Sequence, residues 1–132
     1  MKFFLTCLLA ILFTGTFLCS CKKDNNGVPA PGNSRNIKYE ITGNFTGKLD
    51  VLYSNNVSGN TAVTDVVLPW SKEIQYGSNV ITIGIGAQGK TAGIPGQTAT
   101  IKIYSNGVVV KTSTATAGTL GEIIFPTIAY GF

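Results

Sequence analysis

The sequence predicts an all-β fold, an immunoglobulin-like antiparallel β-sandwich of about seven to eight strands, preceded by a signal peptide and a flexible tether. Three observations lead to this prediction. Apolar and polar residues alternate with a period of two from Ile37 onward, turn residues separate short runs, and no segment keeps a helical period. We therefore divide the chain into a signal peptide (1–20), an N-terminal cysteine with a disordered tether (21–36) and a β-sandwich domain (37–132).

The N-terminal segment has the composition of a secretory signal. Lys2 supplies a positive charge, and residues 3–18 are apolar except for three threonines and one glycine. At about 16 residues, the apolar run is shorter than the ~20 that a helix needs to cross the hydrocarbon core of a bilayer. A cleaved signal peptide is therefore favoured over a permanent transmembrane span.

The sequence Leu18-Cys19-Ser20-Cys21 resembles a bacterial lipobox, with leucine at position −3 and a small residue at position −1. It predicts a lipoprotein in which the signal is cleaved between Ser20 and Cys21 and the Cys21 thiol is acylated, palmitate included. Cys19 is a poorer candidate, because bulky Phe17 and Leu18 precede it where a peptidase requires small side chains. Several acyl chains on one cysteine make a lasting anchor. The alternatives are an ordinary signal peptide with an incidental cysteine and an uncleaved membrane anchor.

The composition after the signal excludes several classes of site and partner. Cys7 and Cys19 leave with the signal and Cys21 is consumed by lipid, so no disulfide, cysteine nucleophile or thiolate metal site remains. Residues 22–36 are rich in Lys, Asn, Gly, Pro and Ser, which is typical of a disordered tether. From residue 37 onward there are six lysines and five acidic residues, and this net charge of +1 is too low for a nucleic-acid binder.

The first two strands are predicted at residues 37–42 and 49–53, both with alternating apolar positions. We expect them to form a β-hairpin with a three-residue loop and Gly47 in the left-handed conformation. A loop of three residues places Ile41 opposite Tyr53, so that the apolar side chains of both strands share one face.

The middle strands are predicted at residues 61–68 and 70–76, and Pro69 between them indicates a bend or an edge position. A fifth strand is expected at residues 80–87. The last strand covers residues 120–132 and is disturbed by an internal proline.

Glycines occupy one face of the fifth strand. Ile81, Ile83 and Ile85 are expected to face inward. Gly84 and Gly86 leave the opposite face bare, which indicates a close backbone approach or a bulge.

The clearest local signal is the dipeptide Asn106-Gly107, which lies between two alternating apolar runs. It predicts a two-residue hairpin turn of type I′. A turn of this length pairs Ile103 with Val110.

Four residues are candidates for an interaction surface: Trp70, Lys102, Tyr104 and Lys111. The predicted turn places Lys102 directly opposite Lys111, beside the outward Tyr104, although like charges across a ladder are mildly unfavourable. The functional interpretation is contact with a small anion or a lipid head group, and the simpler one, which we prefer, is a solubilising lysine pair. Trp70 is either an exposed interface anchor or, as is more common in a small sandwich, part of the core.

No catalytic residue, metal site or cofactor is predicted. The chain has no histidine, which removes Ser-His-Asp and Cys-His machinery and most transition-metal sites. The acidic residues of the domain are not closely paired, and a glycosidase-like pair would need Glu40 and Asp50 to meet by folding. We therefore expect a protein that is not an enzyme, with a hydrolase as the weakest alternative.

Four motifs follow one another along the domain: Lys38-Tyr39-Glu40-Ile41-Thr42-Gly43, Val51-Leu52-Tyr53, Leu68-Pro69-Trp70, and Ile101-Lys102-Ile103 through Asn106-Gly107-Val108-Val109. Together they resemble the MmpS family of small membrane proteins, whose members show Y-E-V-T-G, a second strand ending in tyrosine, L-P-W and I-x-V-D-G-x-V-V. The order and spacing match across nearly all of residues 37–132.

The resemblance implies an accessory subunit of resistance-nodulation-division (RND) lipid exporters, with an N-terminal membrane anchor and an extracytoplasmic β-sandwich. In this chain a lipobox takes the place of the family's transmembrane helix, and the cysteine pair of many members is absent. The implied partner is an RND-type transporter or another envelope protein.

The leading hypothesis is a lipid-anchored, non-enzymatic accessory or interaction module of the bacterial envelope, with the membrane as a partner and no nucleic acid. The alternative is a surface lipoprotein that binds carbohydrate or lipid through exposed aromatic residues. The candidates for that role are Tyr53, Tyr76, Tyr104 and Tyr130. Lys22, directly after the cysteine, favours the outer membrane over the inner one, with the domain facing the periplasm or the cell surface.

Overall fold

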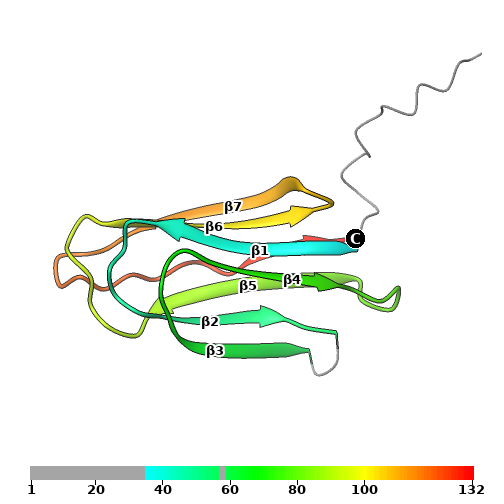
Figure 1. Ribbon diagram of the computed structural model, residues 1–132, viewed down its shortest axis with the longest axis horizontal. Helices are drawn as coiled ribbons and strands as arrows, with labels where there is room; N and C mark the ends of the chain where they lie inside the picture. The colour runs from blue at the N-terminus through cyan, green and yellow to red at the C-terminus, as the bar shows by residue number, and fades with distance from the viewer. Residues whose placement is uncertain (1–34, 57–58) are drawn as a thin grey trace, which may run out of the picture.

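The computed structural model describes residues 35–56 and 59–132. Within these ranges the chain forms no helix and eight strands: β1 (Asn36–Gly43), β2 (Leu49–Ser54), β3 (Asn60–Val66), β4 (Trp70–Gln75), β5 (Thr82–Gly89), β6 (Thr98–Ser105), β7 (Val108–Thr116) and β8 (Ile128–Gly131). They form two antiparallel sheets of four strands, the first in the order β4-β1-β6-β7 and the second in the order β3-β2-β5-β8 (Figure 1). The predicted all-β sandwich is confirmed.

The core lies between the two sheets and is built from the alternating apolar positions of the strands. Ile37, Tyr39 and Ile41 of β1 are at most 1 % exposed, as are Ile83 and Ile85 of β5. Burying a side chain of this size stabilises the fold by about 1.5–3 kcal/mol. The other buried apolar residues are Phe45, Leu49, Val51, Tyr53, Val66, Tyr76, Ala87, Ala99, Ile101, Ile103, Ala117, Ile123 and Phe125.

β1 and β2 do not form the expected hairpin. β1 belongs to the first sheet and β2 to the second, and residues 44–48 carry the chain between the sheets. Gly47 does not have the positive φ that we expected; it packs against the ring of Phe45, where a Cβ would lie 2.6 Å from Cζ. Ile41 and Tyr53 are nevertheless both buried, because they face one core from opposite sheets. Alternation identifies the buried face of a strand but not its partner strand.

Pro69 lies where the chain changes sheets again. β3 is an edge strand of the second sheet and β4 is an edge strand of the first. Both therefore have the edge position that the proline predicted.

The β6–β7 hairpin turns at Asn106-Gly107, as predicted. Both residues have a positive φ, 50° and 79°, which is typical of a type I′ turn. A β-bulge then shifts the register by one residue, so Ile103 pairs with Lys111 and the predicted pairing with Val110 is wrong. Neither glycine nor proline marks this bulge in β7, which is why the sequence did not reveal it.

The prediction for β5 is correct for Ile83 and Ile85 and wrong for Ile81, which is 77 % exposed. β5 begins only at Thr82, so Ile81 precedes the strand. Its carbonyl still accepts a hydrogen bond from the backbone N–H of Phe132 (3.1 Å).

The bare face of β5 receives the C-terminal segment. A Cβ on Gly86 would lie 2.8 Å from Oγ1 of Thr127, which confirms the predicted close approach. The last strand is shorter than predicted, because regular pairing begins only at Ile128, after Pro126. Before the proline, a single bridge joins Ile124 to Gln88.

Candidate interaction surface

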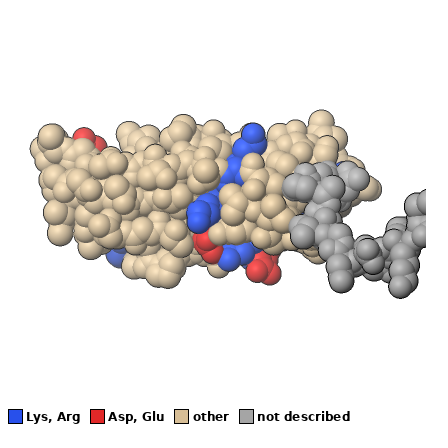
Figure 2. All heavy atoms as spheres, turned by 90° about the horizontal axis from the view of Figure 1, so that it is seen from above, with Lys and Arg blue, Asp and Glu red and all other residues tan. Residues whose placement is uncertain are grey.

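Charged and aromatic side chains meet on the outer face of the first sheet. In β1, Lys38 and Glu40 alternate with buried residues and therefore point away from the core. The register places Lys38 between Glu73 of β4 and Tyr104 of β6, and Glu40 beside Lys102. We call these five residues the outer-face cluster. Figure 2 shows that, on the side it displays, most of the charged side chains lie in a narrow band near the middle, with a few charged atoms farther to the left, and that most of the surface is uncharged.

Three members of the cluster are bonded to one another. Lys38 Nζ lies 2.6 Å from Glu40 Oε1, and the Tyr104 hydroxyl donates a hydrogen bond of 2.7 Å to Glu40 Oε2. Lys38 Nζ also lies 5.0 Å from the centroid of the Tyr104 ring, within reach of a cation–π interaction. The carboxylate thus holds both the ammonium and the phenol in fixed positions.

The same contacts shift the pKa values of the three groups. The hydrogen bond from Lys38, followed by that from Tyr104, lowers the pKa of Glu40. The hydrogen bond to Glu40 raises the pKa of Lys38 and that of Tyr104. At neutral pH, Lys38 is therefore positive, Glu40 is negative and Tyr104 keeps its proton.

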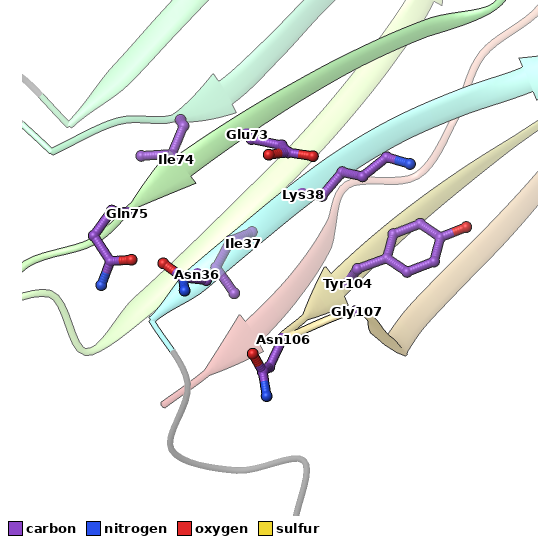
Figure 3. Close-up of a pocket in the computed structure, with 9 residues that line it drawn as sticks. All are labelled: Asn36, Ile37, Lys38, Glu73, Ile74, Gln75, Tyr104, Asn106 and Gly107. Atoms are coloured by element: carbon purple, nitrogen blue, oxygen red, sulfur yellow. The ribbon is translucent and has the colours of Figure 1, made fainter. Parts of the chain in front are cut away.

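A concavity of about 560 Å³ lies beside these groups, where β1 begins. Figure 3 shows the amide side chains of Asn36, Gln75 and Asn106 at this end of the sheet, with Lys38 and Tyr104 farther along β1 and β6. These groups offer several hydrogen-bond donors and acceptors and one aromatic ring. The concavity is therefore suited to binding polar groups.

Two of the predicted residues, Lys102 and Tyr104, belong to this cluster, whereas Lys111 does not. Because of the bulge, Lys102 pairs with Thr112, and the predicted pairing of Lys102 with Lys111 is wrong. Lys111 instead lines a groove between β7 and β8, next to Tyr130. The structure therefore separates the two lysines.

Lys111 is one of several features that protect the sheet edges from pairing with another chain. In β4, Lys72 stands opposite Tyr39, whose side chain enters the core, so this lysine lies on the inner side of an edge strand. Lys111 has the corresponding position in β7. In β3 a register shift lies close to Asp65, which has φ 60°, and β8 is short and follows Pro126. Inward lysines, bulges and short strands all disfavour edge-to-edge association.

Trp70 packs toward the core. It begins β4 opposite Ile41 and is half-buried, and its ring centroid lies 5.9 Å from that of Tyr53. The Tyr53 ring in turn lies 5.5 Å from that of Tyr39. This ladder of rings favours the core interpretation of Trp70 over that of an exposed anchor.

Of the four tyrosines proposed for ligand binding, only Tyr104 lies on an outer sheet face. Tyr53 and Tyr76 are buried, with 6 % and 2 % of their surfaces exposed. Tyr130 is half-buried, and its hydroxyl has no hydrogen-bond partner among the described residues. A row of exposed aromatic rings, as in many carbohydrate-binding surfaces, is therefore not present on the described residues.

A second concavity, of about 300 Å³, lies on the outer face of the second sheet. Leu52 and Ile124 line it and are 51 % and 71 % exposed, and Gly86 lies between them. Oδ1 of Asp50 is buried at this site without a partner among the described residues. The bare glycine face of β5 was the only sign of this site in the sequence.

The predicted processing site, Ser20 and Cys21, lies outside the described residues. Within 35–56 and 59–132, no cluster of acidic or other ligating side chains is arranged to hold a metal ion. The same ranges contain no helix with the length and apolar character of a membrane span.

A comparison with models of known protein families relates this chain to a family of membrane proteins. The model described as "Mycobacterium membrane protein" matches residues 8–119, most of the chain. The chain belongs to this mycobacterial membrane protein family. The match confirms the MmpS-like resemblance and extends from the hydrophobic N-terminal stretch into the loop that follows β7. No curated protein matches the chain individually.

Proposed function

We propose that this protein is a lipid-anchored, non-enzymatic module of the cell envelope that acts as an accessory or interaction subunit. The extent of the family match carries this proposal: a single membrane-protein family model covers the hydrophobic N-terminal stretch and the sandwich together. The lipobox at Cys21 supplies the anchor, and the outer-face cluster supplies a surface for binding.

The junction between tether and domain determines which surface lies nearest the anchor. The guanidinium of Arg35 donates hydrogen bonds to the carbonyls of Gly77 (2.8 Å) and Val80 (2.5 Å), which fixes the start of β1. The tether predicted from the sequence, residues 22–36, is about 15 residues long, and a random coil of that length reaches roughly 20 Å. The 560 Å³ concavity, which Asn36 lines, therefore remains close to the membrane that holds Cys21.

The chemistry of the outer-face cluster is suited to a protein surface. Buried or half-buried tyrosines contribute strongly to interfaces, since they combine a large apolar area with one hydrogen bond. The paired Lys38 and Glu40 can exchange partners with charged residues on a second protein without leaving either charge unpaired. The family resemblance makes an RND-type exporter the first partner to examine, and other envelope proteins the second.

The anchor is tested by replacing cysteines one at a time and analysing the mature protein by mass spectrometry and membrane fractionation. Cys21→Ser is expected to abolish the acylated N-terminal peptide and to leave the signal uncleaved. Cys19→Ser is the matched control and should be processed and acylated normally. A mature wild-type protein with an unmodified N-terminus would overturn the lipid anchor.

The partner surface is tested by co-purification of the tagged protein with an RND-type transporter from native membranes. Lys38→Ala and Tyr104→Ala should reduce the recovery of transporter at least tenfold, because they remove the paired charge and the ring. Lys111→Ala, which lies at the β7 edge, is the control and should retain recovery. Equal recovery with all three variants would contradict the proposed surface.

A second candidate function is the binding of carbohydrate or lipid by the same concavity. It is favoured by the combination of the Tyr104 ring with the amides of Asn36, Gln75 and Asn106, since an aromatic face and amides are suited to sugar hydroxyls or a polar head group. Titration with envelope oligosaccharides and with vesicles of anionic lipid, followed by calorimetry, tests it. Absence of heat changes with both would eliminate this candidate.

A further inference from the structure

The loops at the end of the sandwich opposite the start of β1 form a compact unit. We call residues 91–97 and 117–122 the distal tip. β1 runs away from Asn36, and just beyond its end the backbone N–H of Asn44 donates to the carbonyl of Thr98, at the end of β6 that adjoins the tip. In Figure 1 the loops lie at the left end of the molecule, and the C-terminus lies at the right.

The first loop of the distal tip is rigidly built. Residues 94–97 form a type II β-turn, in which the N–H of Gln97 donates to the carbonyl of Ile94 (3.1 Å) and Gly96 has φ 82°. Oε1 of Gln97 accepts three further hydrogen bonds, from the N–H of Ile94 (2.9 Å) and from the N–H and Oγ1 of Thr46 (both 3.0 Å). A single amide thus joins this loop to the segment that follows β1.

The second loop is bonded to the first. It closes with a turn in which the N–H of Gly121 donates to the carbonyl of Gly118 (3.0 Å). Between the loops, Gly93 donates to Gly121 (2.8 Å) and Gly96 donates to Ala117 (3.0 Å), in both cases from N–H to carbonyl. The tip is therefore ordered by backbone hydrogen bonds before any partner binds.

This rigid tip exposes two aliphatic side chains. Leu120 is 82 % exposed and Ile94 is 61 % exposed, and they flank the Gly93–Gly121 hydrogen bond. Turn geometry does not require them, because asparagine, aspartate, serine and glycine are the residues that tight turns favour. Neither side chain contributes to the core. Their exposure therefore has no explanation in the stability of the fold.

We propose that the distal tip is a docking element that inserts Ile94 and Leu120 into an apolar cleft of a partner protein in the envelope. The inference rests on the proposed function, in that the N-terminal anchor would join the domain at the start of β1, at the end opposite the tip. In the view of Figure 2 most of the charged side chains lie away from the left end of the molecule, where acidic atoms are seen only at the upper edge. A protruding pair of aliphatic side chains fits a cleft, which is the arrangement in which interface anchors contribute most.

The chemistry of the rim follows from Glu122. Its Oε2 accepts a hydrogen bond from the N–H of Leu120 (3.0 Å), so a carboxylate lies directly beside the more exposed of the two side chains. The cleft of the partner should therefore have a basic or hydrogen-bond-donating rim. The same carboxylate disfavours insertion of the tip into an anionic lipid surface.

A second copy of this chain is a poor occupant. A stable interface between proteins buries about 1,600 Å² in total, and two side chains on a convex tip offer far less to an identical convex surface. The protected sheet edges, with Lys72 and Lys111 on their inner sides, do not extend such a contact by strand pairing.

The proposal is tested with photoreactive amino acids placed in the full-length protein in its own cells. Positions 94 and 120 probe the tip. Position 81 is the control, since Ile81 is 77 % exposed and apolar but lies at the opposite end. We expect irradiation at positions 94 and 120 to give one heterologous protein adduct of the same mass, and position 81 not to give it. Ile94→Ser should lower the yield from position 120 at least tenfold while the unfolding temperature stays unchanged.

Three results would overturn the proposal: an adduct with twice the mass of the chain, adducts with lipid only, or the same protein adduct from position 81. An unchanged yield in the Ile94→Ser background would also do so, because the two side chains would then not act together. Mass spectrometry of the mature N-terminus from the same cells distinguishes this failure from failure of the lipid anchor, since only the latter leaves Cys21 without acyl chains.

Discussion

The hydroxyl of Tyr39 lies 2.8 Å from the hydroxyl of Tyr76, in the interior of the protein. The Tyr76 hydroxyl donates in turn to the backbone carbonyl of Ser54. Because a phenol has a single hydrogen to donate, Tyr39 is the donor in the first bond and Tyr76 is the donor in the second. This relay joins β1 of the first sheet to the end of β2 in the second.

The order of donors predicts that loss of the Tyr76 hydroxyl lowers the unfolding free energy more than loss of the Tyr39 hydroxyl. Tyr76→Phe removes both hydrogen bonds and leaves the Tyr39 hydroxyl buried without an acceptor, so we expect a loss of about 2–3 kcal/mol of unfolding free energy. Tyr39→Phe removes one hydrogen bond and leaves the bond from Tyr76 to Ser54 intact, so we expect it to lower the unfolding free energy by only about 1 kcal/mol. Urea denaturation measures both. Equal losses would contradict this order.

The same pair predicts that the protein loses stability in alkali. Burial is the main cause that raises the pKa of Tyr39, with the hydrogen bond to Tyr76 second, and burial also raises the pKa of Tyr76. An unfolded tyrosine has a pKa of about 10. Since the folded values are higher, the stabilising effect is complete below about pH 10 and is lost as the pH rises above it. Urea denaturation at a series of pH values should show this loss, with a smaller slope in Tyr39→Phe than in the wild type. An identical slope would assign the alkaline loss to other groups.

The sequence was sufficient to identify the inward faces of the strands. Alternation correctly assigned Ile83 and Ile85 to the core, and Asn106-Gly107 identified its turn, because these signals are local. The pairing of strands was not recoverable in the same way. Period-two alternation is satisfied equally by a neighbour in one sheet and by a strand across the core, which is why Tyr53 was placed in the wrong sheet.

The candidate site was predicted only in part, because the sequence shows which way a side chain points but not which strand lies beside it. Tyr104 and Lys102 were correctly expected to point outward from β6. Lys38 and Glu40 were not identified as their partners, because the contact joins strands that are distant in sequence. Lys111 was placed on the wrong neighbour by one bulged residue, and a bulge without glycine or proline leaves no signal in the sequence.

The inner-side lysines should keep the protein monomeric. Replacing Lys72 or Lys111 by valine leaves an apolar side chain at an edge strand and removes the charge that opposes strand pairing. We expect both variants to self-associate more at high concentration, measured by sedimentation. Lys102→Val is the matched control, because Lys102 lies on β6, which has a neighbour on each side. Stronger association of Lys102→Val than of the other two would argue against edge protection.

The contribution of Asp65 to stability should depend more on its backbone conformation than on the charge of its side chain. Its carboxylate lies 2.6 Å from Lys90 Nζ and 3.3 Å from Lys48 Nζ, and these contacts, led by the hydrogen bond from Lys90, lower its pKa. Because the folded pKa is the lower one, this stabilisation is present above about pH 4 and is lost as the pH falls through the folded value. The ion pairs are exposed and therefore weak. Its φ of 60°, by contrast, is tolerated by asparagine and not by valine.

Two substitutions at position 65 separate these effects. Asp65→Asn keeps the backbone conformation and should lower the thermal midpoint only slightly, with a weaker dependence on acid. Asp65→Val should lower it much more at every pH, since a β-branched residue at positive φ is strained. If the asparagine variant lost as much stability as the valine variant, the ion pairs would be the dominant contribution.

The stability of the distal tip should depend on the absence of a side chain at Gly121. Gly121 and Gly107 have nearly the same φ, 78° and 79°, and differ in their surroundings. A Cβ on Gly121 would collide with the carbonyl of Gly93, whereas a Cβ on Gly107 would meet nothing within 4 Å. Gly107→Ala should therefore cost about 1–2 kcal/mol, the strain of a left-handed alanine. Gly121→Ala should cost about 1–3 kcal/mol more, because the loops must move apart. Urea denaturation gives both values, and equal losses would mean that the two loops are not held together at this contact.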